Sequence, residues 1–166
     1  EPFSSALRIS NIKNYKYDWI WNKSKVGNIF NCKNAPQKDY ENICVFSFAK
    51  IANGSNLKMV YNPQGLIEIN KIRKNKSKGR EGKTIGLRPS RLDNSEYKQI
   101  NTNYPRQILK FSNEQGFHPT QKPVELMEYL IKTYTNENET VLDFTMGSGS
   151  TGVACVNTNR NFIGIE

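Results

Sequence analysis

The sequence has few of the features that mark membrane, zinc or disulfide-stabilised proteins. Its most apolar stretch, residues 126–131, is already interrupted by Glu and Tyr, whereas a membrane-spanning helix needs about 18 consecutive apolar residues. The first five residues lack the basic start and apolar block of a signal peptide,. One histidine and three widely spaced cysteines without a C-x-x-C pair argue against a zinc site and a disulfide framework,. We therefore expect no metal, no membrane and a reducing, cytoplasmic setting.

The composition indicates a folded and strongly basic chain. Its 166 residues suit one domain, and eight Phe, eight Tyr and two Trp argue against disorder,. Twenty-four Lys and Arg against fifteen Asp and Glu give a formal net charge of +9. Such an excess favours a polyanionic partner through counterion release, although basic proteins without a nucleic-acid partner are common.

Residues 1–49 form the first of three regions and are rich in aromatic and β-branched residues. Aromatic residues alternate at positions 15, 17, 19 and 21, which predicts a strand with Trp19 and Trp21 in a sheet core rather than on a base-stacking platform,. Residues 43–48 predict a buried strand. The apolar spacing over residues 4–12 allows a short helix,.

Residues 50–115 form the middle region, which is basic and has little periodic pattern. Nine basic residues fall between positions 71 and 91 against one acid, Glu81. A solvated loop and a nucleic-acid contact both fit such a charge run. The candidate DNA-binding residues are Lys71, Arg73, Lys74, Lys76, Lys78, Arg80, Lys83, Arg88 and Arg91.

Residues 116–166 form the third region and carry the clearest element pattern. A helix is predicted from Pro123, because proline suits the first helical turn and apolar residues follow at three- and four-residue spacing,. A strand over 140–144, a Gly/Ser turn, a helix over 151–156 and a strand over 162–165 follow. This order is typical of the first half of an open parallel α/β sheet.

The turn after the strand at 140–144 carries a ligand-binding pattern. Gly147, Gly149 and Gly152 satisfy G-x-G-x-x-G between a strand and a helix,. Glu166 closes the next strand, where a carboxylate can accept hydrogen bonds from a ribose diol,. The pattern alone does not separate NAD, FAD and S-adenosylmethionine (SAM), and a tight turn without a ligand remains the alternative.

The ordered set of motifs resembles the β class of site-specific DNA amino-methyltransferases, the adenine-N6 and cytosine-N4 enzymes of bacterial and phage restriction-modification systems. The residues that carry the resemblance are 1–5, 17–23, 41–47, 116–123 with the H-P-T-Q-K-P element, 124–126, 141–143 and 146–152. The resemblance implies a Rossmann-like SAM-dependent methyltransferase fold, α/β with an open, mostly parallel sheet and helices on both faces. It also implies SAM as cofactor, double-stranded DNA as partner, and a variable target-recognition region in the middle.

The resemblance also implies roles for individual residues. Glu166 would hold the ribose of SAM. The glycine loop and its preceding acid would line the methionine end, and the H-P-T-Q-K-P element would approach the methionine carboxylate. For His118, a surface residue that fixes the turn before Pro119 is the alternative. The predicted cofactor-binding residues are His118, Thr120, Lys122, Asp143, Phe144, Gly147, Ser148, Gly149 and Glu166.

Two departures from the family pattern shape the functional expectation. The loop has Phe144 and Thr145 where the family usually has Pro and Phe, and the catalytic tetrapeptide D-P-P-Y or S-P-P-Y appears nowhere. We therefore expect an incomplete fold, the C-terminal part of a longer enzyme, and no methyl transfer by this chain alone. Adenine is favoured over cytosine by resemblance only. The alternatives are a nicotinamide or flavin oxidoreductase and a non-catalytic DNA-binding remnant.

Overall fold

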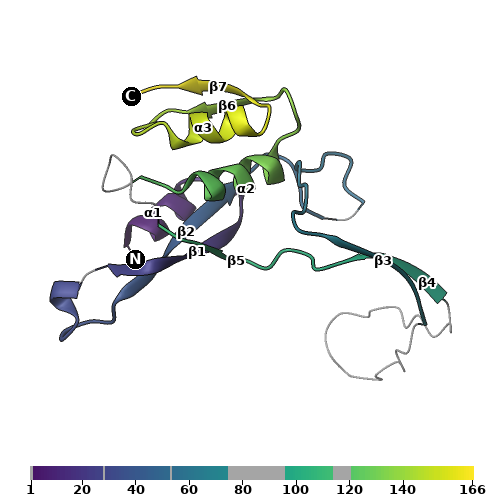
Figure 1. The fold of residues 1–166 in the computed structure, drawn as a ribbon, viewed down its shortest axis with the longest axis horizontal. Helices are drawn as coiled ribbons and strands as arrows, with labels where there is room; N and C mark the ends of the chain where they lie inside the picture. The colour runs from purple at the N-terminus through teal and green to yellow at the C-terminus, as the bar shows by residue number, and fades with distance from the viewer. Residues whose placement is uncertain (1, 28, 53, 75–95, 114–120) are drawn as a thin grey trace. The chain divides into compact units, whose positions relative to one another are not determined.

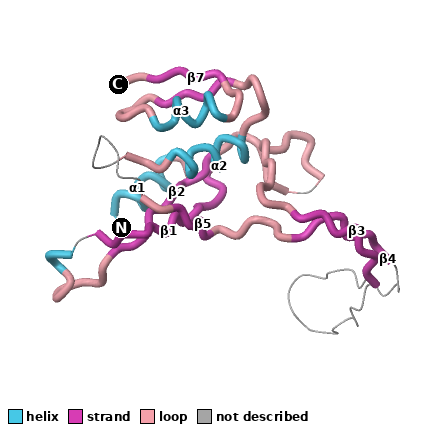
Figure 2. Tube along the Cα trace, in the orientation of Figure 1, coloured by secondary structure: helices cyan, strands magenta, loops and turns pink. Residues whose placement is uncertain are grey.

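The computed structural model describes residues 2–27, 29–52, 54–74, 96–113 and 121–166. The chain divides into two compact units, one comprising Glu1–Gln64 and Arg106–Glu166 and the other comprising Gly65–Pro105. Figure 1 traces the elements along the chain, and Figure 2 separates helices, strands and loops by colour. The second unit thus interrupts the sequence of the first.

The first unit contains a three-stranded sheet in the order β2-β1-β5. Strand β1 (Tyr15–Gly27) pairs antiparallel with β2 (Lys38–Phe46) and parallel with β5 (Ile108–Phe111). A short 3-10 helix, η1 (Ile29–Asn31), lies between β1 and β2 in the chain. Both strands predicted in residues 1–49 are present, but the prediction of a buried strand over 43–48 is wrong: β2 is an edge strand that ends at Phe46, and Val45 is its one buried residue. The alternating side chains of β1 bury Trp19 and Trp21, which are 3% and 2% exposed, in the core of the unit,.

Helix α2 (Val124–Tyr134) follows Pro123 and packs against two groups of apolar residues. Leu126 joins the tryptophans of β1 in one buried cluster, whereas Ile131, one and a half turns later, packs with helix α3 (Ser150–Asn157),. At the C-terminal end, the Tyr134 hydroxyl accepts a hydrogen bond of 2.5 Å from Trp19 Nε1. The helix predicted from Pro123 is confirmed, with proline as its N-cap residue.

The last part of the first unit is a parallel βαβ unit. Strand β6 (Thr140–Asp143) leads through the glycine loop into α3, and β7 (Asn161–Gly164) returns parallel to β6. Within the described residues, β6 and β7 form a two-stranded sheet separate from the sheet of β1. The predicted order of strand, loop, helix and strand is confirmed.

Helix α1 (Pro2–Ser10) confirms the short N-terminal helix, but its apolar side chains are not core residues. Ile9 is 70% exposed and Leu7 is 42% exposed. The helix is linked to β1 by Arg8, whose Nη2 lies 2.5 Å from Asp18 Oδ2.

The second unit is an antiparallel pair of strands, β3 (Ile67–Lys74) and β4 (Glu96–Thr102). The beginning of the basic segment is therefore a strand and not a loop. The pairing has an irregularity between Glu68 and Lys71, where Asn70 adopts a left-handed φ of 44°. Such a bulge shifts which residues share a face of the strand.

The chain leaves and re-enters the first unit at two hydrogen-bonded positions. Before the second unit, the backbone N–H of Asn62 donates to the carbonyl of Thr133 at 2.7 Å, and its side chain donates to the carbonyl of Thr135 at 3.1 Å. After it, the carbonyl of Gln107 accepts a hydrogen bond of 2.8 Å from the N–H of Ile20. Both junctions are thus fixed to the first unit.

Candidate functional site

The glycine loop makes a sharp turn between β6 and α3. Gly147 and Gly149 have φ angles of 49° and 75°, a left-handed conformation that costs glycine little,. Gly149 is also the N-cap residue of α3. The third glycine of the pattern, Gly152, lies against the ring of Phe162 on β7, and a Cβ at this position would lie 2.9 Å from Cε1 of that ring. The pattern therefore serves both the turn and the packing of helix on strand.

Asp143, the last residue of β6, fixes the shape of this loop. Its Oδ1 accepts a hydrogen bond of 3.1 Å from the backbone N–H of Thr145, and its Oδ2 accepts one of 2.6 Å from the hydroxyl of Thr151. The carboxylate thus connects the end of the strand with the start of the loop and the first turn of the helix.

Glu166 reaches the same loop from the end of β7. Its Oε2 accepts a hydrogen bond of 2.6 Å from the backbone N–H of Gly147. Backbone hydrogen bonds from Met146 to Ile165 and from Ile165 to Asp143 hold the two chain segments together. A carboxylate offers about four acceptor positions, so a bond from Gly147 leaves capacity for a ligand.

These residues border a cavity of about 740 Å³. It lies at the carboxyl ends of the parallel strands β6 and β7, where open α/β sheets bind their ligands,. Its lining comes from the glycine loop, the segment before α2, α2 itself and the C-terminal residue. The lining residues are Gln121, Lys122, Met127, Asp143, Thr145, Met146, Gly147, Ser148, Ser150, Thr151 and Glu166.

Lys122 connects this cavity with the sheet of β1. Its Nζ donates a hydrogen bond of 2.8 Å to Oε2 of Glu41 on β2 and lies 5.5 Å from the centre of the Trp21 ring. Lys23 forms an ion pair with the other oxygen of Glu41. Burial alone would raise the pKa of Glu41, but the hydrogen bonds from Lys122 and Lys23 outweigh it and hold this pKa below its usual value,.

Five predicted cofactor-binding residues border the cavity: Lys122, Asp143, Gly147, Ser148 and Glu166. Of the remaining four, Gly149 contributes the helix cap, the Phe144 side chain is 72% exposed, and His118 and Thr120 lie outside the described residues.

Sequence reasoning missed several residues around the cavity. Gln121 and Thr145 lie within motifs that the sequence analysis had already recognised, so their sequence positions could have indicated a role in the site. Met127 belongs to the apolar residues at helical spacing after Pro123, a pattern that predicts a helix and not a ligand site. Glu41 lies in a segment that carries the family resemblance, but no local signal indicated its contact with Lys122, which is 81 residues away in the chain.

The candidate DNA-binding residues that the structure describes lie on β3 in the second unit. Lys71, Arg73 and Lys74 are exposed. Arg73 Nε donates to Gln99 Oε1 at 2.8 Å, and Lys74 Nζ lies 3.3 Å from Glu96 Oε1 on β4. The other six candidates, Lys76, Lys78, Arg80, Lys83, Arg88 and Arg91, lie outside the described residues.

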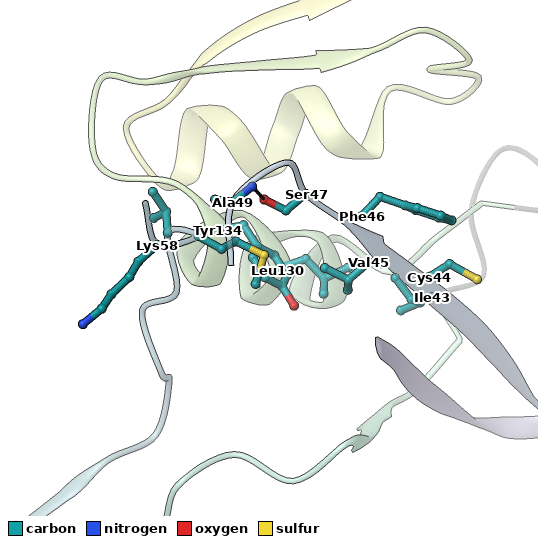
Figure 3. Close-up of a pocket in the computed structure, with 11 residues that line it drawn as sticks. Ile43, Cys44, Val45, Phe46, Ser47, Ala49, Lys58, Leu130 and Tyr134 are labelled. Carbon is teal, nitrogen blue, oxygen red and sulfur yellow. Dashed lines mark hydrogen bonds between the residues drawn. The ribbon is translucent and has the colours of Figure 1, made fainter. Parts of the chain in front are cut away.

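A second recess, of about 550 Å³, lies beside the edge strand β2 (Figure 3). Its lining is mainly apolar, with Val45 and Leu130 among the side chains drawn, and Lys58 is the one charged residue in it. The Ala49 N–H donates a hydrogen bond of 3.1 Å to Ser47 Oγ at its rim. This recess has no group of converging polar side chains comparable with the cavity at the glycine loop.

Two classes of feature were not found in the described part of the chain. No group of three or more His, Cys, Asp or Glu residues there could hold a metal ion. Among the same residues, no helix is both long and apolar enough to cross a membrane.

Comparison with known proteins identifies the family. A family model described as DNA methylase matches residues 3–166. The chain belongs to this DNA methylase family. The predicted resemblance to DNA amino-methyltransferases is therefore confirmed.

Curated relatives support the same assignment. The chain is 30% identical over 149 residues to the type II methyltransferase M2.DpnII of Streptococcus pneumoniae, a match that covers 89% of this chain and 54% of the relative. It is 32% identical to M2.LlaDCHI of Lactococcus lactis subsp. cremoris, and this match also covers 89% of this chain and 54% of the relative. The chain thus spans about half the length of these relatives.

Solved structures confirm the predicted fold class. A complex of M1.HpyAVI with SAM matches 99% of this chain and 63% of its own, with 30% identity and a TM-score of 0.58. The cytosine-N4-specific PvuII DNA methyltransferase is similar in fold, with a TM-score of 0.59 at 15% identity, and is matched over 51% of its length. The α/β fold of this chain is that of DNA methyltransferases.

Proposed function

We propose that this chain is the SAM-binding part of a site-specific DNA amino-methyltransferase. The whole enzyme transfers a methyl group from SAM to the exocyclic amine of a base in double-stranded DNA, with adenine N6 favoured over cytosine N4. A cytoplasmic location, where SAM and DNA are both present, fits this role. The observation that carries the proposal is the cavity at the ends of β6 and β7, bordered by the glycine loop, Lys122 and Glu166.

The chemistry of the cavity fits SAM. Gly147 lines the cavity, and a Cβ there would meet its nearest atom, the Thr145 carbonyl oxygen, only at 4.0 Å, so the bare backbone leaves room for a ligand,. Glu166 supplies an acceptor for hydroxyl groups of a ribose, and Lys122 supplies a cation for a carboxylate. Asp143 also lines the cavity, where its charge favours the ammonium of a methionine end,.

The residues of this chain bind and orient, while the reactive group belongs to the cofactor. SAM supplies an electrophilic methyl group on its sulfonium sulfur when it is bound. The target amine is paired and stacked in duplex DNA, so the base must leave the helix before it can react. Family enzymes use the D-P-P-Y or S-P-P-Y tetrapeptide to hold that amine, and no such tetrapeptide occurs in these 166 residues.

We assign DNA contact to the basic strand pair of the second unit. Lys71, Arg73 and Lys74 place three cations on one strand, β3. Lysine and arginine side chains bind phosphates and release counterions, which gives affinity without sequence information.

Isothermal titration of the purified chain with SAM, NADH and FAD tests the cofactor assignment. We expect binding of SAM alone, and a loss of roughly tenfold or more in affinity for Glu166→Ala, because hydrogen bonds to charged groups contribute about 1.5–3 kcal/mol. Glu137→Ala removes an exposed carboxylate and serves as the matched control. Binding of NADH or FAD instead of SAM would support the oxidoreductase alternative, and binding of duplex without SAM would support a DNA-binding remnant.

A further inference from the structure

Glu41 on β2 bridges two lysines beside one tryptophan ring. Its Oε2 accepts a hydrogen bond of 2.8 Å from Lys122, and its Oε1 pairs with Lys23. The two ammonium groups lie 5.5 and 5.3 Å from the centre of the Trp21 ring. Only one of these cations, Lys122, borders the cavity at the glycine loop.

The register of the sheet creates this arrangement. Glu41 is the cross-strand partner of Trp21 in the antiparallel pair of β1 and β2. Lys23 lies two residues after Trp21 on β1 and therefore on the same face of the sheet. Lys122 comes to this face from the segment before α2, a helix that packs on the same tryptophan cluster.

The cluster is partly shielded from water, so its charges affect one another. The side chains of Lys23, Glu41 and Lys122 are 21%, 33% and 39% exposed. Without Glu41, the two lysine ammonium groups would face the Trp21 ring with no carboxylate to neutralise either of them. With Glu41, the cluster keeps one net positive charge, and the long Lys122 side chain is held by a hydrogen bond and an aromatic face.

We propose that Glu41 is a positioning residue that holds the Lys122 ammonium at the cavity wall to receive the methionine carboxylate of SAM. The inference rests on the proposed function and extends it to a residue outside the SAM-binding segment. An ammonium group has three N–H donors, and the bond to Glu41 uses one of them. A held ammonium binds a carboxylate without the entropy loss of ordering a free lysine side chain.

Loss of Glu41 has two opposing effects, and their magnitudes decide the expected sign. Removing its charge favours a nearby ligand carboxylate, but measured interactions between partly exposed charges change affinity by only about fivefold or less. Without the hydrogen bond from Glu41, ligand binding must order the freed Lys122 side chain, which lowers affinity by up to roughly tenfold to thirtyfold. We therefore expect weaker binding of SAM.

The test uses the full chain and two ligands that differ in the methionine end. SAM carries the carboxylate, whereas 5′-methylthioadenosine keeps the adenosine and lacks the carboxylate. Titrations compare wild type, Glu41→Ala, Glu41→Gln, Lys122→Met and the double variant Glu41→Ala with Lys122→Met. Asp39→Asn is the matched control, because Asp39 lies on the same strand, is exposed and accepts a hydrogen bond from Asn22 instead.

We expect Glu41→Ala to weaken SAM binding by roughly threefold or more and Glu41→Gln, which keeps an acceptor, by less. All variants should bind 5′-methylthioadenosine as wild type does, and the double variant should bind SAM no more weakly than Lys122→Met alone. Unchanged SAM affinity in Glu41→Ala would overturn the inference while leaving the proposed function intact. Equal losses for both ligands would show that Glu41 acts only on the fold. A wild-type chain that binds no SAM would overturn the proposed function, and this inference with it.

Discussion

The hydroxyl of Thr151 donates a hydrogen bond of 2.6 Å to Oδ2 of Asp143 and so ties the first turn of α3 to the end of β6. Thr151 is buried, with 9% of its surface exposed. The other oxygen of the same carboxylate accepts from the N–H of Thr145. The Asp143 carboxylate therefore joins the start of the glycine loop to the first turn of α3.

Replacing Thr151 with valine should destabilise this loop. Valine keeps the shape of threonine but leaves Asp143 Oδ2 without its hydroxyl donor, which should cost about 1–3 kcal/mol in unfolding free energy. Urea unfolding followed by circular dichroism measures the loss. Thr151→Ser retains the hydroxyl and should lie closer to wild type. Equal losses for both variants would mean that packing of the methyl group, and not the hydrogen bond, holds the loop.

Replacing Gly152 with alanine should destabilise the packing of α3 on β7. The new Cβ would lie 2.9 Å from Cε1 of Phe162, and overpacking of this kind costs about 1–3 kcal/mol,. The helix propensity of alanine returns up to about 1 kcal/mol, so the net change remains unfavourable. Gly27→Ala is the control, because its Cβ would meet the Lys38 carbonyl at an ordinary 3.6 Å. Thermal unfolding of the two variants should show a lower midpoint for Gly152→Ala only.

The ion pair between Arg8 and Asp18 should make stability depend on pH in the acid range. Burial alone would raise the pKa of Asp18, but the hydrogen bond from Arg8 helps to outweigh it and holds this pKa below its usual value. A depressed pKa stabilises the fold above the unfolded value of about 4, and the contribution is lost as the pH falls through the folded value.

Denaturant titrations of Arg8→Met at several pH values between 7 and 2 test this expectation. The variant should be less stable than wild type at pH 7, and the difference should shrink as the pH falls below about 4. Arg106→Met removes an exposed arginine and should differ from wild type by the same amount throughout. A pH-independent loss in Arg8→Met would contradict the assignment to Asp18.

Neutralising Lys71 and Arg73 together with glutamine should weaken duplex binding and its salt dependence. Each lost phosphate contact should reduce the slope of log K against log salt by about 0.9 in magnitude. Lys25→Gln with Lys33→Gln removes two exposed lysines from the first unit and is the charge-matched control. An equal change of slope in both double variants would mean that the effect follows net charge and not the basic strand.

The purified 166-residue chain should not methylate DNA. Positioning groups contribute orders of magnitude in rate, and the tetrapeptide that holds the target amine in family enzymes is absent from the sequence,. Incubation with methyl-labelled SAM and unmodified duplex measures transfer, with an intact type II relative as positive control. Reproducible labelling of the DNA would show that a residue within the chain performs the role assigned to the tetrapeptide.

The parts of the fold that could be predicted are those whose sequence pattern lies within a few neighbouring residues. The alternation that buries Trp19 and Trp21 repeats every two residues, and the apolar positions of α2 repeat every three or four,. The glycine loop combines a turn, a close packing position and a helix cap in six residues. Such local requirements leave a direct trace in the sequence.

The parts that were missed depend on pairing between distant residues. Ile67 and Ile69 alternate, but the next isoleucine, at position 72, is out of phase because a bulge follows Glu68. The basic composition then hides strand β3. Strand β5 has only four residues and gains its place from parallel pairing with β1. The contact between Glu41 and Lys122 depends on sheet register and helix docking together, which no local pattern encodes.

The two anchored junctions around residues 65–105 have an evolutionary consequence. Asn62 is bonded to the end of α2 before the excursion, and Gln107 is bonded to β1 after it. Because the closure entropy of an inserted segment grows only slowly with its length, we expect the first unit to tolerate insertions of very different size at this place. A gene for such a chain can therefore exchange the whole segment by recombination at two boundaries. If the segment contacts DNA as proposed, such an exchange would change the DNA target while the proposed SAM-binding framework is inherited unchanged.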